Sequence, residues 1–303
     1  MKTISVITPF YRGNAYINHL ADVLEANAER LAETAKSGRT DQAEGPETVE
    51  WLIVNDSPDS PVSLNGNWPR LSVRVIDLPR NGGIHHARAE GLRRAKGEAI
   101  LFLDQDDRIA PDFLVRQKKQ MEEDADVAVC GVLLEKPDGT AEPIYRTKAD
   151  LEDIRKLDVY LRVKNPIRSP GQCLIRRSAI PDAWSRTPMK RNGSDDLLLW
   201  IMMLARHARF IVMPDCLYTH RYTGENVSDS IPQITASSME MTEILRASGE
   251  LNQRQLDDLR RSVEWGGRTS EENRRYYLKD SRIFLARLWW KIRHALSAPL
   301  KEE

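Results

Sequence analysis

Short apolar runs alternate along the first half of the chain with stretches in which apolar residues return at the period of a helix. The runs are rich in β-branched residues and cover 4–10, 49–57, 71–78, 98–104 and 126–135. After Asn14, a candidate helix cap, apolar residues recur at helical spacing at Ile17, Leu20, Leu24, Ala28 and Leu31. Further helices are expected to begin near Gly83 and Pro111. Strands that alternate with helices form mostly parallel sheets with right-handed crossovers, so the pattern predicts an α/β fold.

From about residue 140 the alternation weakens. Helical spacing covers 151–163 and a stretch from Asp195, whereas 171–177 and 209–222 are typical of strands. After about residue 230 the pattern is helical to the end, so we place a boundary there and expect 231–303 to form a helical extension. The segment 28–47 is expected to end the first helix in a polar loop.

Charge and composition exclude several classes of function. Lysine plus arginine and aspartate plus glutamate are both 45, and the net charge of zero gives no support for a nucleic-acid partner. The three cysteines lie far apart without zinc-ligand spacing, which favours a reducing compartment. No signal peptide is evident, and the longest apolar run, 197–205, is too short to span a bilayer. We therefore expect a cytoplasmic protein.

Three carboxylates, Asp104, Asp106 and Asp107, directly follow the apolar run that ends at residue 103. Polar residues also follow the first two strands, at 8–11 and 55–57. In open α/β sheets, ligands bind outside the carboxyl ends of the strands. Clustered carboxylates there suit Mg²⁺ or Mn²⁺ carrying a phosphate ligand, and the alternative is a loop with a helix cap. The chain has no GxGxxG or GxxxxGK[ST] motif, which argues against a dinucleotide site and a P-loop.

Two predicted helix starts carry further candidates. Asn81 and Gly83 allow a tight turn ahead of Arg88, and free backbone N–H groups there can receive an anion. Asp195 and Asp196 follow a candidate cap at Ser194, where the helix dipole would keep a carboxylate ionised as a general base requires. Acidic residues are also ordinary in a first turn. Adjacent histidines at 85–86 point apart on a helix and make a poor metal pair.

Taken in order, these segments resemble the family 2 glycosyltransferases of GT-A fold over roughly residues 3–230. "SVITPFYRG" resembles the opening strand and nucleotide loop, and "LIVNDSPD" resembles V-D-D-x-S. The most specific match is "NGGIHHARAEGLRRAKGEAILFLDQDD", which resembles N-x-G-x-x-x-A-R-N-x-G…G-x-x-[IL]-x-x-L-D-x-D-D. "PGQCLIRRSAI", "SDDLLLW" and "LYTHRYTGENVS" are similar to the G-x-x-x-x-R-R, E-D-x-x-L and closing segments. The sequence departs from the family pattern at Asn55, Glu90 and Asp195.

The resemblance implies a mostly parallel central sheet with flanking helices. A Rossmann-like nucleotide-binding half would cover 1–110, and an acceptor-binding half 111–230. Asp196 matches the catalytic base, with Asp195 beside it, and Ser228 lies in the closing segment. The residues expected to bind the nucleotide-sugar are Thr8, Pro9, Tyr11, Asp56, Asn81, Gly83, Arg88, Asp104 and Arg221. Those expected at the metal are Asp106, Asp104 and His220.

The implied reaction is an inverting transfer of a sugar from a nucleoside diphosphate, UDP by default, to a hydroxyl of a glycan or lipid-linked glycan. Mn²⁺ or Mg²⁺ would assist departure of the diphosphate. One alternative is a sugar-phosphate nucleotidyltransferase, but "TPFYRGNAYINHL" lacks the glycine-rich opening of that family. Another is a degenerate domain that binds nucleotide or acts as a scaffold.

The segment 281–296 raises a separate question. At helical spacing one face is apolar, whereas Arg282, Arg287, Lys291, Arg293 and His294 occupy most of the remainder. A cationic face with tryptophan suits a helix on an anionic membrane, which would place the protein on the inner face of the plasma membrane. The alternative is packing of the apolar face on the catalytic domain or on a second subunit of a homo-oligomer.

Overall fold

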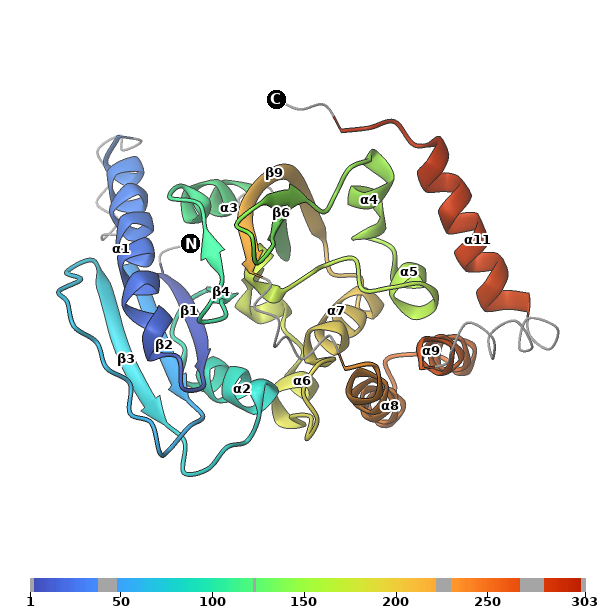
Figure 1. The fold of residues 1–303 in the computed structure, drawn as a ribbon, viewed down its shortest axis with the longest axis horizontal. Helices are drawn as coiled ribbons and strands as arrows, with labels where there is room; N and C mark the ends of the chain where they lie inside the picture. Colours follow the sequence, from blue (N-terminus) through green and yellow to red (C-terminus); the bar gives the residue numbers. More distant parts are fainter. Residues whose placement is uncertain (1–2, 38–47, 122–123, 222–229, 268–280, 301–303) are drawn as a thin grey trace.

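The computed structural model describes residues 3–37, 48–121, 124–221, 230–267 and 281–300. Four parallel strands form its first half in the order β3-β2-β1-β4, shown on the left of Figure 1. Their bounds are Thr3–Phe10 for β1, Thr48–Asn55 for β2, Leu71–Asp77 for β3 and Ala99–Phe102 for β4. The order reverses at β1, since β2 lies on one side of it and β4 on the other. Ligands bind at such a switch point, outside the carboxyl ends of the strands.

Two crossover helices cover this half of the sheet. Helix α1 (Asn14–Ser37) connects β1 to β2, and α2 (Ile84–Arg94) connects β3 to β4. Asn14 is the first residue of α1 rather than a cap, because its side chain bonds the backbone of Pro61 and Ser63. The loop expected at the end of α1 falls on 38–47, outside the described residues.

The second half of the sheet mixes strand directions. Here β8 (Cys173–Arg176) joins β4 and β6 (Val127–Glu135) by antiparallel pairing, and β9 (Phe210–Arg221) runs parallel to β6. The short strands β5 (Arg108–Ile109) and β7 (Ala141–Pro143) extend the edges. The predicted α/β architecture is confirmed.

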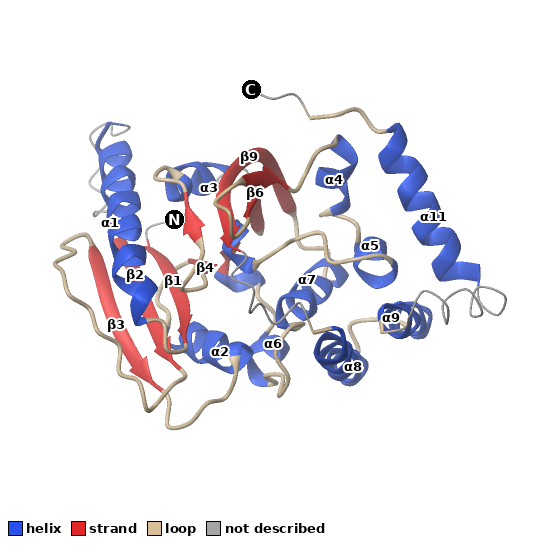
Figure 2. Ribbon diagram, viewed as in Figure 1, coloured by secondary structure: helices blue, strands red, loops and turns tan. Residues whose placement is uncertain are grey.

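Helices surround this mixed half, as Figure 2 shows in blue. The stretch expected as one helix at 151–163 forms two short helices instead. The elements are α3 (Phe113–Met121), α4 (Lys148–Asp153), α5 (Leu157–Arg162), η1 (Pro170–Gln172), η2 (Arg177–Ala179), α6 (Asp182–Arg186) and α7 (Asp195–Ala205). Helix α7 lies in the core and begins at the two acidic residues picked out from the sequence.

Three described helices follow residue 230: α8 (Ile231–Ser248), α9 (Gln253–Gly266) and α11 (Ser281–Leu296). Met241, Leu245, Leu256 and Leu259 belong to the same apolar core as the sheet, so α8 and α9 pack directly on the preceding residues. Helix α11 lies at the right-hand edge of Figure 1, and Ile283 is its one buried residue. Among the described residues no helix combines the length and apolar character needed to cross a bilayer.

Candidate active site

A cavity of about 700 Å³ opens at the carboxyl ends of β1 and β4, at the switch point of the sheet. It gathers most of the residues singled out from the sequence. Those lining it are Pro9, Tyr11, Asp56, Asn81, Gly83, Arg88, Asp104, Asp106, Asp195, Asp196 and His220. The carboxyl ends of adjacent parallel strands meet at one edge, which explains why segments 100 residues apart contribute to one site.

One glutamine joins the loops after β1 and β4. The backbone N–H of Tyr11 donates to Gln105 Oε1 at 3.0 Å, and Gln105 Nε2 donates back to the Tyr11 carbonyl at 3.1 Å. The tyrosine ring remains half exposed. Thr8 is not part of the site, contrary to the prediction. It is fully buried, and its hydroxyl accepts a hydrogen bond from Trp51 Nε1 inside the sheet.

Asp56 organises the turn that precedes α2. Its two carboxylate oxygens accept the backbone N–H groups of Gly82 at 2.7 Å and Gly83 at 2.8 Å. Burial raises the pKa of Asp56, although these two donors oppose the shift. The next N–H, of Ile84, is taken by Asn192 Oδ1 at 3.1 Å. The three successive N–H groups of this turn, on Gly82, Gly83 and Ile84, are therefore taken by Asp56 and Asn192 rather than left for an anion.

Gly83 is required at this turn. Its φ is 87°, in the left-handed region, and a Cβ there would lie 2.6 Å from Asn192 Oδ1. Asn55, which departs from the family pattern, is 1% exposed, and its side-chain amide donates to Asp77 Oδ1 at 2.9 Å at the end of the neighbouring strand. Asn55 thus supports the loop and does not line the cavity.

Arg88 connects the two acidic groups of the cavity. Its Nη2 donates to Asp104 Oδ1 at 2.6 Å and its Nη1 to Asp195 Oδ2 at 2.7 Å; Arg88 and Asp195 are buried, and Asp104 is partly exposed. Burial acts to raise the pKa of Asp195, but Arg88 and His85 outweigh it and the pKa is lowered. Asp195 is therefore held ionised by Arg88. The guanidinium is committed to these two carboxylates, so it does not act as a free cation for a diphosphate.

Asp106 differs from its neighbours because it forms no ion pair with any described residue. Burial, followed by repulsion from Asp107 and Asp104, raises the pKa of Asp106 to about 6. Asp107 is buried, accepts a hydrogen bond from Tyr218 and lies 3.3 Å from His220 Nδ1. Asp107 thus orients Tyr218 and His220 of β9.

Asp196 is the carboxylate with the most perturbed acidity in the cavity. Burial, followed by the nearby charge of Asp195, raises the pKa of Asp196 to about 7. Its Oδ2 accepts from Asn165 Nδ2 at 2.9 Å, and its Oδ1 accepts the N–H of Leu197 at 2.7 Å. The expected dipole effect, which would lower the pKa, is outweighed. Ser194 does not cap the helix, because its hydroxyl lies 2.9 Å from that of Ser238 on α8.

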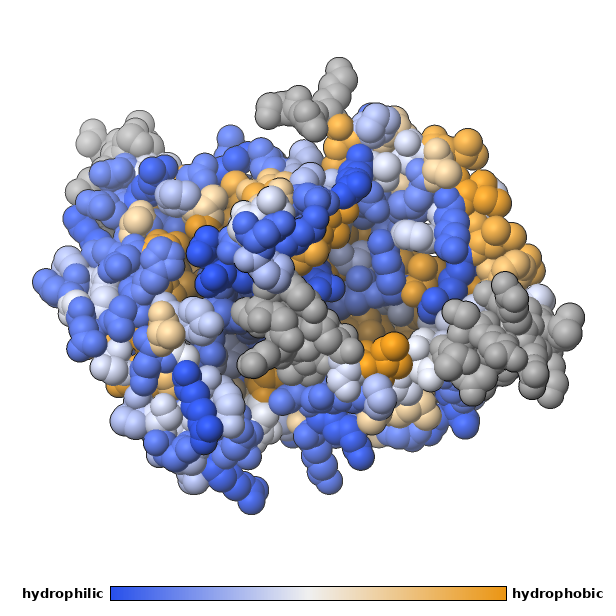
Figure 3. Space-filling view, viewed as in Figure 1, coloured by the Kyte–Doolittle hydropathy of each residue, from blue (hydrophilic) through white to orange (hydrophobic). Residues whose placement is uncertain are grey.

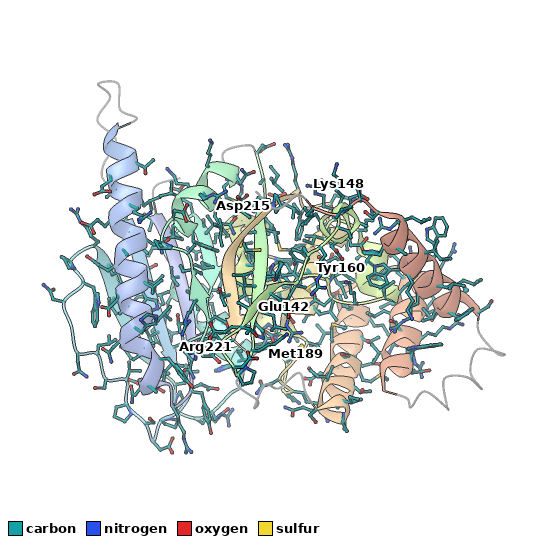
Figure 4. The ribbon with its side chains drawn as sticks, turned by 45° about the horizontal axis from the view of Figure 1, so that its top comes forward. Glu142, Lys148, Tyr160, Met189, Asp215 and Arg221 are labelled. Carbon is teal, nitrogen blue, oxygen red and sulfur yellow. The ribbon has the colours of Figure 1, made fainter. Side chains whose placement is uncertain are left out.

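Two predicted residues of the closing segment have different outcomes. His220 lines the cavity, whereas Arg221 does not, because its Nε donates to Glu135 Oε1 at 3.1 Å. Figure 4 labels Arg221 at the end of β9. Ser228 lies outside the described residues. His85 is a core residue: its Nδ1 accepts the N–H of Met189 at 2.9 Å, and burial lowers its pKa.

Sequence reasoning missed several residues that line the cavity or hold its side chains in place. Gln105 and Asn165 act through amide hydrogen bonds that no short motif signals, and Asn192 comes from the loop before α7. Arg168 also lines the cavity and forms no ion pair with a described residue. Its position after the short α5 helix gave no signal in the sequence.

A divalent cation fits the donors present. Across the described part of the chain, no three His, Cys, Asp or Glu side chains are grouped closely enough to hold a metal by themselves. Mg²⁺ and Mn²⁺ sites of phosphate-transfer type take one or two carboxylates and complete the shell with phosphate oxygens. Asp106 is an unpaired carboxylate in a negative environment, and His220 is oriented through Asp107 as metal-binding histidines are.

A sheet with a parallel half and a carboxylate-rich cavity at its switch point is the architecture of a ligand-binding α/β protein. The sequence model of Glycosyl transferase family 2 matches residues 5–184, more than half of the chain, and the chain therefore belongs to this family. The resemblance seen in the sequence motifs is confirmed.

Several curated proteins are similar to this chain. YwdF of Bacillus subtilis (strain 168), named an uncharacterized glycosyltransferase, is 33% identical over 122 residues, covering 37% of this chain and 44% of YwdF. TuaG of the same organism, a glycosyltransferase whose name assigns it provisionally to teichuronic acid biosynthesis, is 27% identical over 232 residues, covering 75% of this chain and 82% of TuaG. The succinoglycan biosynthesis protein ExoO of Rhizobium meliloti (strain 1021) is 42% identical over 82 residues, 27% of this chain and 22% of ExoO. The matched region thus spans less than half of YwdF and of ExoO.

The fold is that of a solved glycosyltransferase. The crystal structure of S. aureus TarS 1–349 in complex with UDP-GlcNAc aligns with a TM-score of 0.56 at 21% identity, covering 87% of this chain and 72% of that one. The UDP complex of the same TarS fragment gives 0.53 at 20% identity, covering 92% and 75%. The likeness shows the GT-A fold predicted from the sequence.

Proposed function

We propose that this chain is an inverting glycosyltransferase that moves a sugar from a nucleoside diphosphate to an acceptor hydroxyl. The observation that carries the proposal is the presence of Asp196, with a pKa near 7, in one cavity with Asp104 and Asp106. A carboxylate whose pKa lies near the working pH is suited to act as a general base. Membership of glycosyl transferase family 2 supports the class of reaction.

In the proposed step Asp196 accepts the proton of the acceptor hydroxyl. The acceptor oxygen forms a bond to the anomeric carbon of the donor as the bond from that carbon to the diphosphate oxygen breaks. A single displacement with one base inverts the configuration at this carbon. Asn165 holds the Asp196 carboxylate through its 2.9 Å hydrogen bond, and Asp195 is kept in place by Arg88.

We assign Asp106 and His220 to a Mn²⁺ or Mg²⁺ ion, with oxygens of the donor diphosphate as further ligands. When bound, the ion stabilises negative charge on the departing diphosphate. Asp104 would add negative charge to the site while paired with Arg88. Because Arg88 is committed in this way, Arg168 is the cation of the cavity that we assign to the diphosphate.

A UDP-sugar is the proposed donor, since the similar TarS fragment is described in complex with UDP-GlcNAc and with UDP. The half-exposed ring of Tyr11 offers a face on which a base can stack, and Asp56 lines the same cavity. The names of TuaG and ExoO support a glycan or lipid-linked glycan acceptor in polysaccharide assembly.

The proposal is tested by measuring nucleotide release and nucleotide binding for UDP-, dTDP- and GDP-sugars with Mn²⁺, Mg²⁺ or a chelator. Asp106→Ala is expected to lose about 10²-fold or more in turnover and to lose metal-dependent binding, because a metal contributes several kcal/mol. Asp196→Asn is expected to lose about 10²-fold or more in transfer while still binding the nucleotide. Asp112→Asn, a half-exposed carboxylate close to the loop, is the matched control.

Turnover of Asp106→Ala within a few-fold of the unchanged protein would contradict the metal assignment. Metal-dependent nucleotide binding without any donor hydrolysis or transfer would favour the binding-module alternative.

A further inference from the structure

Helix α11 is attached to the protein by its polar side. Trp290 Nε1 donates to Asp153 Oδ2 at 2.6 Å, and His294 Nε2 lies 3.1 Å from the same oxygen. Arg293 forms ion pairs with Asp153 and Glu152. The Asp153 side chain is fully buried under these three residues. The carboxyl half of α11 is therefore fixed to α4 by hydrogen bonds and charge.

The first half of α11 is attached in the same manner to α9. Arg282 lies 3.5 Å from Asp258, and the Arg287 guanidinium lies 5.5 Å from the centre of the Trp265 ring. Ile283 fills the space between the helices and is fully buried. These contacts settle which face of α11 looks outward, and it is the face that the sequence pattern predicts to be apolar.

The outward face exposes a continuous apolar stripe. Five of the eight exposed large hydrophobic residues in the described chain lie on it, namely Leu285 (54%), Leu288 (40%), Trp289 (66%), Ile292 (41%) and Leu296 (82%). Figure 3 shows this stripe in orange along the right-hand edge of the molecule. Exposure gathered on one helix, rather than scattered, is typical of an interaction surface.

Pairing of this stripe with the same stripe on a second copy of the chain would bury too little area for a stable dimer. A helix of 16 residues is about 24 Å long and about 10 Å wide, so pairing two stripes covers roughly 240 Å² on each chain. Stable protein interfaces cover about 800 Å² on each partner. Binding to a lipid surface does not require a minimum interface area with a rigid partner, because each apolar side chain that inserts into the lipid is removed from water independently.

The charge of the segment selects the kind of lipid. Residues 281–300 contain four Arg or Lys residues and no Asp or Glu. Lys291 is exposed beside the stripe and forms no ion pair with a described residue, and Arg282 is exposed at its beginning. Cations that flank the inserted face of an interfacial helix attract anionic lipid headgroups.

We propose that α11 docks the protein on an anionic membrane, with Leu285, Trp289 and Ile292 inserted at the boundary between headgroups and acyl chains. The ion pairs with α4 and α9 keep this face directed away from the protein, so the helix does not need to detach in order to bind. Insertion supplies most of the affinity and Lys291 supplies the preference for anionic lipid.

The test measures partitioning of the full-length chain onto phosphatidylcholine vesicles with and without phosphatidylglycerol, without any donor sugar. The variant Leu285→Ser/Trp289→Ser/Ile292→Ser is expected to partition at least about tenfold less than the unchanged chain, because three apolar side chains are removed from the stripe. Val75→Ser/Ile231→Ser replaces exposed apolar residues elsewhere and is expected to bind normally. Lys291→Glu is expected to reduce binding to anionic vesicles only. Thermal melting shows that each variant remains folded.

Equal partitioning of the triple variant and the unchanged chain would overturn the proposal, as would equal binding to neutral and anionic vesicles. A dimer in solution that the triple variant dissociates, with no vesicle binding by the unchanged chain, would assign the stripe to a second copy. Because the assay contains no substrate, its result is independent of whether the proposed transfer reaction is correct.

Discussion

Turnover is expected to fall as the pH is lowered through 7, because Asp196 must be ionised to accept a proton. Burial and Asp195 raise the pKa of Asp196 to about 7. About nine tenths of the carboxylate is then ionised at pH 8 and just under one tenth at pH 6, so kcat should fall roughly tenfold between these values.

Substitution of Asn165 is expected to change the pKa of Asp196. Its Oδ1 accepts the N–H of Ile167 at 3.1 Å, which turns its amide donor toward Asp196. Asn165→Ala removes a hydrogen bond that favours the charged carboxylate. A hydrogen bond worth about 1 kcal/mol corresponds to roughly 0.7 pH units, so the acid limb should move upward by about that amount.

The assay is kcat as a function of pH at saturating donor, acceptor and Mn²⁺, measured by release of the nucleoside diphosphate. Asp106, with a pKa of about 6, titrates in the same range, and its protonation should appear in the KM for donor and metal instead. Circular dichroism at each pH excludes unfolding. A flat kcat between pH 6 and 8, or the same midpoint in Asn165→Ala, would refute the reasoning.

Three further changes test the energetics of the cavity. Asp196→Asn should raise the melting temperature at pH 8 but not at pH 4. In the folded state the pKa of Asp196 is raised from 3.8 to about 7, so ionisation of Asp196 destabilises the native state as the pH rises from about 4 to 7, by on the order of 2–4 kcal/mol. Arg88→Met should lower the unfolding free energy in urea by about 3–5 kcal/mol, because the buried Asp195 and the partly buried Asp104 both lose their partner, and an unchanged midpoint would contradict this. Gly83→Ala, at φ 87°, should cost about 1–2 kcal/mol in thermal melting and weaken donor binding, with an unaltered donor KM as the contrary result.

The position of the site was predictable from the sequence, whereas its internal pairing was not. Polar residues after consecutive strands must meet when the strands are parallel, which brings Asp56 and Asp104 into one cavity. Strand β1 is buried on both faces, so its residues do not alternate and nothing in the pattern shows that Thr8 faces the core. The role of Asp107 depends on Tyr218, a residue 111 positions later that only the folded sheet brings into contact.

Helix α11 shows a different limit. Its periodicity correctly predicts a helix with one apolar face, and the usual expectation is that this face packs inward. The structure reverses the orientation because Asp153 and Asp258, on two other helices, pair with the cationic side. Sequence periodicity describes one element at a time and contains no information about acidic partners on other helices, such as Asp258, 24 positions before Arg282, or Asp153, 140 positions before Arg293.

Arg88 has a consequence for how this cavity is dissected by mutation. One guanidinium is shared between Asp104 and Asp195, so removing either carboxylate changes the charge balance of the other. Single substitutions at these three positions will therefore not sum to the effect of the triple change. Their energetic contributions belong to the triad as a unit, and only a complete cycle of single, double and triple variants separates them.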